Sequence, residues 1–358
     1  MPVDSEERGP MARDEAERTM IIAEMAWAHN GLVENALELL RGAKAAGADA
    51  LGIHVTSVPD YMTPDYRCSD GVTTSDRSVG EIYRYLERLN LSYAEWDRVF
   101  AEARACGLGL CAMCNDEPSL EYVQRAGPTM YVIAAACFAE LEFVRSIGRQ
   151  RKPTVLRIGG ATLGEIERVT DTLRAEGTSD ITLLHGIQLY PTDIRQLNLA
   201  ALATLKMTFG CKVGLADHID GDLEVARVLP LLALPYGATM LEKHITIDRA
   251  LKHEDFEAAL DIGNFKRFVG FVREAERSLG RGTLGVLSEA DLKYRRVSRK
   301  KIVARRAIRR GQTIGREDIA FKRSDRGAEP CEIDMLIGRV ATRDVEVNDG
   351  LDLDAARS

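Results

Sequence analysis

Eight short apolar segments alternate with longer amphipathic ones between Met20 and Leu279, and this alternation constrains the fold more than any other feature of the sequence. Each short segment is almost continuously apolar, as expected of a parallel strand that is buried on both faces. Eight strands alternating with helices over about 250 residues are typical of a (β/α)8 barrel, or TIM barrel. The eight expected strands are Met20–Met25, Ala50–Val55, Gly109–Met113, Met130–Ala135, Thr154–Ile158, Ile181–His185, Lys212–Ala216 and Thr239–Ile245.

Helical periodicity follows most of the expected strands, and two of the expected helices end at a glycine, which commonly stops a helix. Leu32–Ala45 is followed by Gly47, and Leu91–Ala105 by Gly107. A doubly wound open sheet is the alternative fold. It is disfavoured because no G-x-G-x-x-G turn follows the first expected strand. The remaining expected helices are Thr162–Arg174, Asp193–Thr208, Leu223–Leu232 and Phe256–Leu279.

Changes in composition divide the 358 residues into four parts. Residues 1–18 are polar and acidic, and we expect a disordered extension there. Residues 19–280 form the expected barrel, and the polar residues 281–298 show little periodicity, as expected of a linker. Residues 299–358 contain short strand-like pieces separated by glycine turns. They predict a compact, β-rich second domain.

Charge and hydropathy exclude several classes of protein. The net charge of −7 argues against a nucleic-acid-binding surface. No segment approaches the ~20 apolar residues that span a bilayer, and the first residues lack the apolar core of a signal peptide. The sequence has seven cysteines, an odd number, and they are scattered along the chain. This pattern is typical of a protein in a reducing compartment. We therefore expect a cytoplasmic protein without a nucleic-acid or membrane partner.

Polar residues interrupt the apolar segments where a barrel of this kind carries its active site, at the C-terminal ends of the strands. His54, His185, His218 and His244 fall at or just beyond such ends, and Glu24 lies within the first strand. A single strand-end histidine is more often a hydrogen-bonded structural residue. Four of them on different strands, together with carboxylates, favour a divalent metal site.

Two further motifs are weaker. Cys111-x-x-Cys114 resembles half of a zinc or redox site, but no second pair with suitable spacing is present, so packed small residues are the better interpretation. Gly159-Gly160 precede a helix that we expect to start near Thr162. Their backbone N–H groups could therefore receive a phosphate.

Several longer stretches occur together, in one order, between about Met20 and Leu353. They are IIAEMAWAHNG, LNLSYAEWDRVFAEARACGLGL, KPTVLRIGGATLGEIE, LLHGIQLYPT, VGLADH, LEKHITIDR, ARRAIRRGQTIGREDIAFKR and EIDMLIGR. By these stretches the sequence resembles the sialic acid synthase family, which includes the N-acetylneuraminate, legionaminate and pseudaminate synthases. The resemblance implies a barrel followed by a C-terminal antifreeze-like (SAF) domain. In this family that domain caps the barrel mouth of a partner subunit, which implies a domain-swapped homodimer.

The family condenses phosphoenolpyruvate with an open-chain N-acetylated amino sugar, using a divalent metal that polarises the sugar aldehyde. The resemblance thus implies a sugar or sugar-derived substrate and a bound Mn²⁺ or Mg²⁺, with Zn²⁺ as an alternative. Its motifs imply metal ligands at His218 and His244. They imply catalytic roles for Glu24, His54, Tyr190 and Lys243, and substrate-binding roles for Arg157, Gln188, Asp217 and Arg323.

The expected phosphoenolpyruvate pocket departs from the family pattern. Gly52 and Val132 stand where the family has two lysines that hold the phosphate, and His54 stands where it has a glutamine. A charge-assisted contact to phosphate contributes about 1.5–3 kcal/mol, so two lost lysines correspond to a factor of roughly 10²–10⁴ in affinity. Arg157 replaces the first residue of an S-T-G motif, and we expect it to clamp a carboxylate or phosphate of the substrate.

Three functions are compatible with this pattern. The first is a metal-dependent enzyme that acts on a sugar or sugar-derived substrate without phosphoenolpyruvate, by aldol or retro-aldol cleavage, epimerisation or dehydration. In that case Glu24 or His54 serves as the acid or base. The second is a true phosphoenolpyruvate-condensing synthase with a rebuilt phosphate site. The third is a sugar-binding pseudoenzyme. Retention of costly polar residues at a buried mouth favours an enzyme.

Overall fold

The computed structural model describes residues 18–66, 81–280 and 285–357. It divides into two compact units, Met1–Gly282 and Thr283–Ser358. The extension expected over residues 1–18 lies outside the described residues except for Arg18, and so does Cys68. Among the described helices, none is both long and apolar enough to cross a bilayer.

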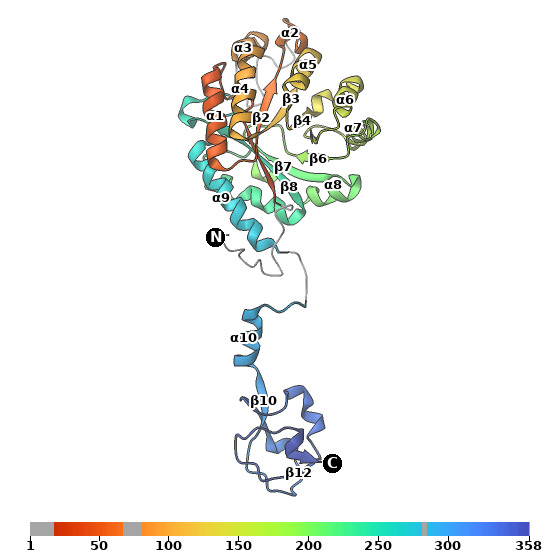
Figure 1. The fold of residues 1–358 in the computed structure, drawn as a ribbon, viewed down its shortest axis with the longest axis vertical. Helices are drawn as coiled ribbons and strands as arrows, with labels where there is room; N and C mark the ends of the chain where they lie inside the picture. The colour runs from red at the N-terminus through yellow and green to blue at the C-terminus, as the bar shows by residue number, and fades with distance from the viewer. Residues whose placement is uncertain (1–17, 67–80, 281–284, 358) are drawn as a thin grey trace, which may run out of the picture. The chain divides into compact units, whose positions relative to one another are not determined.

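Eight parallel strands of the first unit follow one another in sequence order, and β1 pairs with both β2 and β8. The second pairing closes the sheet, so the barrel is confirmed and the open sheet is excluded. Figure 1 shows the helices arranged around these strands. The strands are β1 Met20–Glu24, β2 Ala50–Val55, β3 Gly109–Cys114, β4 Met130–Ala134, β5 Thr154–Arg157, β6 Ile181–His185, β7 Lys212–Asp217 and β8 Ala238–Thr246, with the short β9 Leu260–Asp261 beside β8.

The helices of the first unit follow the expected alternation. Two of them, α4 and α7, begin with a capping box in which the side chains of Ser92 and Thr162 each accept a backbone N–H three residues on. The helices are α1 Val33–Ala46, α2 Val58–Tyr61, α3 Ile82–Leu89, α4 Tyr93–Cys106, α5 Glu117–Ala126, α6 Leu141–Gly148, α7 Leu163–Ala175, α8 Ala201–Phe209 and α9 Ile262–Leu279. Short 3-10 helices cover Ala135–Cys137, Ile194–Gln196, Glu224–Arg227, Leu229–Tyr236 and Arg249–Leu251.

Three expected helices differ from those observed. The helix expected over Asp193–Thr208 is broken at Asn198, whose φ of 43° is left-handed, and α8 starts after it. The one expected over Leu223–Leu232 is two 3-10 helices, because Pro230 has no N–H to donate. The last begins at Ile262 rather than Phe256, where the Asp261 side chain caps it.

Side chains of the barrel strands alternate between two apolar layers, because successive residues of a strand point to opposite faces. The outer layer lies between strands and helices and includes Ile21, Leu51 and Leu241. The inner layer fills the barrel with Ile22, Ala50, Cys111, Met113, Met130, Val132, Val155, Leu184, Ala216 and Met240. Cys111 belongs to the inner layer and Cys114 to the outer one, and both are free thiols. The interpretation of this motif as packed small residues is therefore confirmed.

The second unit is small and rich in short strands. Its apolar core includes Ile302, Ile314 and Leu336. Part of the expected linker is helical, since a capping box at Ser288 starts α10, in which every residue is at least partly exposed. Its elements are α10 Glu289–Ser298, β10 Lys300–Ala304, β11 Ile319–Arg323, β12 Val340–Ala341 and β13 Ala356–Arg357, with 3-10 helices at Arg316–Asp318, Pro330–Met335 and Leu353–Ala355.

A buried ion pair lies in the outer layer of the barrel. Lys243 Nζ contacts Asp217 Oδ2 at 2.6 Å and the Ile219 carbonyl oxygen at 3.1 Å, and both charged side chains are buried. Lys243 alternates with Glu242 and His244 along β8, so it points away from the barrel interior. The geometry therefore gives the two residues a structural place, in which they join β7 to β8, and the roles expected for Lys243 in catalysis and Asp217 in substrate binding stay predictions.

We predict that Asp217→Ala lowers the free energy of unfolding by about 3–5 kcal/mol, because it leaves the Lys243 ammonium buried and unpaired. The matched control is Asp180→Ala, which breaks the exposed pair with Lys212 (2.9 Å) and should cost less than about 1 kcal/mol. Urea unfolding followed by circular dichroism measures both. Equal, small losses in the two variants would contradict the structural role.

Candidate active site

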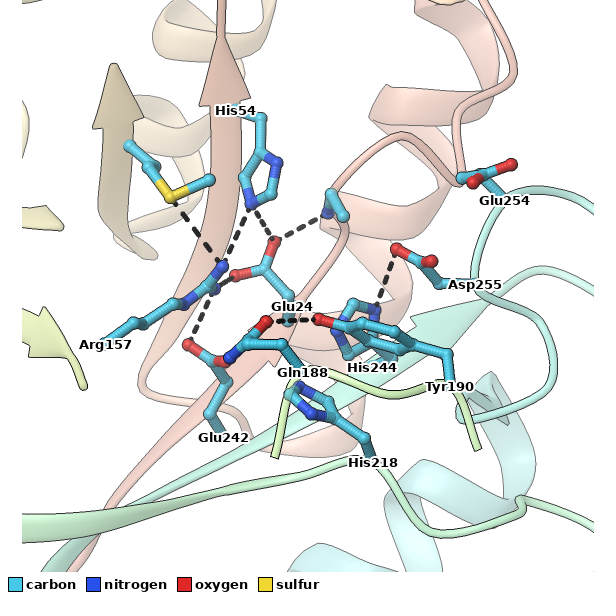
Figure 2. A network of polar contacts seen from close by, with 12 residues as sticks. Glu24, His54, Arg157, Gln188, Tyr190, His218, Glu242, His244, Glu254 and Asp255 are labelled. Atoms are coloured by element: carbon cyan, nitrogen blue, oxygen red, sulfur yellow. Dashed lines mark hydrogen bonds and ion pairs between the residues drawn. The ribbon is translucent and has the colours of Figure 1, made fainter. Parts of the chain in front are cut away.

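Polar side chains gather at the C-terminal end of the barrel, contributed by different strands. Glu24, at the end of β1, is in register with Gly52 of β2 and with His244 of β8. Along each strand, the residues between those of the outer layer point into the barrel. His54 and Arg157 are two such residues, so their side chains reach the same end of the barrel interior as Glu24. Figure 2 shows these side chains turned toward one another.

Arg157 is the centre of a buried polar cluster. Its Nη2 contacts Glu242 Oε2 at 2.8 Å and also bonds Glu24 Oε2, while its Nη1 lies 3.1 Å from His54 Nε2 and 3.9 Å from the Met113 sulfur. Burial alone would lower the pKa of Arg157, but the carboxylates of Glu24 and Glu242 outweigh it and raise that pKa. The guanidinium therefore stays charged and is neutralised from within the protein.

Arg157, expected to clamp an anionic group of the substrate, bonds protein groups in this structure. Both terminal nitrogens already bond protein groups, and the residue is only 7% exposed. The Glu24 carboxylate also has protein partners at both oxygens, since its second oxygen, Oε1, accepts the backbone N–H of Ala26 at 2.6 Å. Its geometry gives it a structural place in the cluster, and its expected role as acid or base stays a prediction.

Glu242 joins this cluster and was not among the site residues expected from the sequence. It precedes His244 by two positions on β8, so the alternation of strand side chains already placed it on the inner face. Burial raises its pKa to about 7, against the opposing effect of Arg157. A carboxyl of this kind can hold or release a proton near neutral pH, which is what general acid–base chemistry requires.

His54 contacts this cluster from β2, with its side chain 12% exposed. A guanidinium has only donors, so the Arg157 contact requires His54 Nε2 to be the acceptor. Burial lowers the pKa of His54 to about 4, so the ring is neutral and carries its proton on Nδ1. His54 therefore presents a hydrogen-bond donor rather than a free base.

His218 and His244 form a second group in the mouth, with ring centroids 5.2 Å apart. His218 Nδ1 donates to the Ile187 carbonyl oxygen at 2.7 Å, which leaves Nε2 with its lone pair. His244 Nε2 is buried and finds no hydrogen-bond partner in the described part of the chain, while Nδ1 lies 3.7 Å from Asp255 Oδ2. Burial lowers the pKa of both imidazoles, so both are neutral.

This pair fits a divalent metal in its donor chemistry, because two neutral imidazole nitrogens have no hydrogen-bond partner among the described residues and one ring is oriented by a backbone carbonyl. Within residues 18–66, 81–280 and 285–357, no group of three or more His, Cys, Asp or Glu side chains is arranged to hold a metal ion. An ion on His218 and His244 would therefore take its remaining ligands from water or substrate. Asp255, which the sequence did not suggest, is close enough to orient His244.

Tyr190 covers the two imidazoles. Its ring centroid lies 4.3 Å from that of His218 and 5.3 Å from that of His244, and its hydroxyl donates to Gln188 Oε1 at 3.0 Å. Burial raises the pKa of Tyr190, so the hydroxyl keeps its proton. Tyr190 and Gln188, both expected at the site, are thus brought into it.

Two other sequence features of the barrel have local structural partners, and a third belongs to the second unit. His185 Nε2 donates to the Leu197 carbonyl oxygen at 2.9 Å, as a structural histidine does. The start of α7, where Gly159-Gly160 were a candidate phosphate site, already holds the Glu165 carboxylate, which accepts the Thr162 N–H at 2.7 Å. Arg323 ends β11 in the second unit and is exposed, so its contact with the sugar stays a prediction.

Known proteins resemble this chain in both sequence and fold. A model of the NeuB family matches residues 39–284, more than half of the chain. The chain belongs to the NeuB family, the sialic acid synthase family. A SAF-domain model matches residues 299–354, which identifies the second unit of this family member.

Named relatives of this NeuB-family chain cover most of its length. The pseudaminic acid synthase of Campylobacter jejuni is 33% identical over 93% of this chain and 95% of its own, and the N,N'-diacetyllegionaminic acid synthase of Legionella pneumophila is 29% identical over 89% of each. The fold is shared with the putative spore coat polysaccharide biosynthesis protein E of Chromobacterium violaceum (TM-score 0.76, 22% identity, 95% and 100% coverage). The family thus comprises sugar-biosynthesis enzymes.

We predict opposite tautomers for two histidines of the barrel. Because Arg157 donates to His54, that ring should carry its proton on Nδ1, whereas His185 should carry it on Nε2. Two-bond ¹⁵N–¹H correlation spectra of selectively labelled protein at neutral pH distinguish the two forms. The assignment is wrong if His54 shows the Nε2–H form, and Arg157→Met should remove its preference while leaving His185 unchanged.

Proposed function

We propose that this member of the sialic acid synthase family is a metal-dependent enzyme that performs carbonyl chemistry on a sugar or sugar-derived substrate without phosphoenolpyruvate. Two neutral imidazoles, His218 and His244, offer unpaired nitrogens on one side of the barrel mouth. On the other side, the positive charge of Arg157 is bound by two carboxylates. This division of the mouth is the observation that carries the proposal.

In this proposal His218 and His244 hold Mn²⁺ or Mg²⁺, with Zn²⁺ as the alternative. Lewis-acid polarisation of a carbonyl or hydroxyl oxygen is the chemistry that such an ion supplies when bound. The Ile187 carbonyl fixes the His218 ring, and Tyr190 shields both imidazoles from water. These contacts hold the two imidazole rings in a fixed orientation before any substrate binds.

The remaining groups supply hydrogen bonds and a proton site. His54 donates from Nδ1 to an oxygen of the substrate, because Arg157 holds its Nε2. Glu242 is the proton carrier in this proposal, since its pKa of about 7 allows both protonation states at neutral pH. Aldol or retro-aldol cleavage, epimerisation and dehydration each need these three elements, and the residues do not select among them.

The relatives' names favour a second candidate, a synthase that condenses phosphoenolpyruvate in a rebuilt pocket. The coverage of 93% of this chain by the Campylobacter jejuni pseudaminic acid synthase supports it. The described strand ends that surround Arg157 oppose it, because they offer no unpaired ammonium group and both terminal nitrogens of the Arg157 guanidinium already bond protein groups, which leaves only Nε without a partner.

We predict that removing either imidazole weakens metal binding selectively. His218→Ala and His244→Ala should lower the affinity of metal-stripped protein for Mn²⁺ by at least about 100-fold, since even the loss of groups that orient metal ligands costs about 10–100-fold. Electron paramagnetic resonance of free Mn²⁺ measures the affinity. His185→Ala is the matched control and should bind as the wild type does. Unchanged binding by His244→Ala would overturn the metal site.

We also predict that the purified protein does not consume phosphoenolpyruvate. Incubation with phosphoenolpyruvate, Mn²⁺ and N-acetylmannosamine, or related amino sugars, should release no phosphate above the rate without protein, because the expected phosphate lysines are absent at Gly52 and Val132. A colorimetric phosphate assay is sufficient. Release at an enzymatic rate that depends on the sugar would favour the synthase instead.

A further inference from the structure

Gly52 has no space for a side chain. A Cβ atom there would collide with the Glu24 carboxylate, lying 2.7 Å from its Cδ and closer still to Oε2. The backbone of Gly52 is not left-handed, in contrast to Gly47 with its φ of 90°. Gly52 is therefore required by the position of Glu24 and not by the conformation of β2.

Glu24 cannot move aside without losing its partners. Its Oε2 bonds Arg157, and its Oε1 accepts the Ala26 N–H. Any side chain at position 52 would push the carboxylate away from the guanidinium. The absence of a side chain at position 52 and the pairing of Glu24 with Arg157 are thus two parts of one arrangement.

The charge of this arrangement is not positive. Arg157 contributes one positive charge, Glu24 and Glu242 one negative charge each, and the neutral His54 none. Since these groups are buried, an added anion would meet little screening and no net attraction.

We propose that Gly52 and Arg157 together determine the charge of the ligand group that this side of the barrel mouth accepts: an uncharged oxygen-bearing group enters, and a phosphate or carboxylate is rejected. Gly52 lets Glu24 lie against Arg157, and Glu24 then occupies the Nη2 group of the guanidinium that an anion would need. His54 remains as the donor for a hydroxyl, carbonyl or amide oxygen. This inference rests on the proposed function only in taking the barrel mouth as the ligand site.

The test is whether a side chain at position 52 creates anion binding. Gly52→Ala displaces the Glu24 carboxylate and exposes Arg157, so the affinity for inorganic phosphate should rise at least about tenfold over the wild type. Isothermal titration calorimetry on metal-free protein measures it, and omitting the metal prevents phosphate from binding there. Gly164→Ala is the matched control, because a Cβ at that exposed helix position meets no atom within 4 Å.

A second variant keeps the test informative if Gly52→Ala does not fold. Glu24→Gln preserves the shape of the side chain and removes one negative charge, so phosphate affinity should again rise. The gain in either variant should disappear when Arg157→Met is added. The proposal is overturned if the wild type binds phosphate as tightly as Gly52→Ala, if neither variant gains affinity, or if the gain persists without Arg157.

These outcomes are separate from those of the metal experiments. Phosphate binding to metal-free protein depends on Gly52, Glu24 and Arg157, whereas Mn²⁺ binding depends on His218 and His244. Failure of the anion test therefore leaves the metal site standing, and failure of the metal test leaves the ligand-charge inference standing.

Discussion

The contact of the Arg157 guanidinium with the carboxylates of Glu24 and Glu242 is the interaction on which the rest of the barrel mouth depends. It joins β1, β5 and β8 across the interior of the barrel. Each charge is buried, and removing one partner would leave another uncompensated at a cost of about 3–5 kcal/mol. The tautomer of His54 and the lack of space at Gly52 both follow from it.

The mouth consequently has two chemically different sides. On one side, the terminal nitrogens of Arg157 and both oxygens of Glu24 have protein partners, while Arg157 Nε and Glu242 Oε1 have none among the described residues. On the other, His244 Nε2 is buried without a partner among the described residues, and His218 Nε2 is left free by the bond that its Nδ1 makes. Buried polar groups normally have partners, so an unpaired nitrogen marks the place where a ligand belongs.

The fold was predictable because the apolar pattern of each strand is local. All eight strands lie within two residues of the expected ranges, whereas the expected helix over Asp193–Thr208 failed at the left-handed Asn198, which periodicity does not reveal. The outward direction of Lys243 follows from its alternation with Glu242 and His244 along β8, which the periodicity of a strand predicts. The pairing of Arg157 with Glu24 was not available, because it depends on the rotamers of side chains 133 positions apart.

Stability alone does not account for a charged cluster at this position. Replacing a buried ion pair by well-packed apolar side chains is often neutral or stabilising by about 1–4 kcal/mol. The inner layer directly below, with Val132 and Val155, shows that this barrel can fill its interior with apolar groups. What apolar residues could not provide is a fixed His54 tautomer, a carboxyl that titrates near neutral pH and a guanidinium closed to anions. These properties act on a ligand, so the cluster is better understood as part of the binding site than as part of the core.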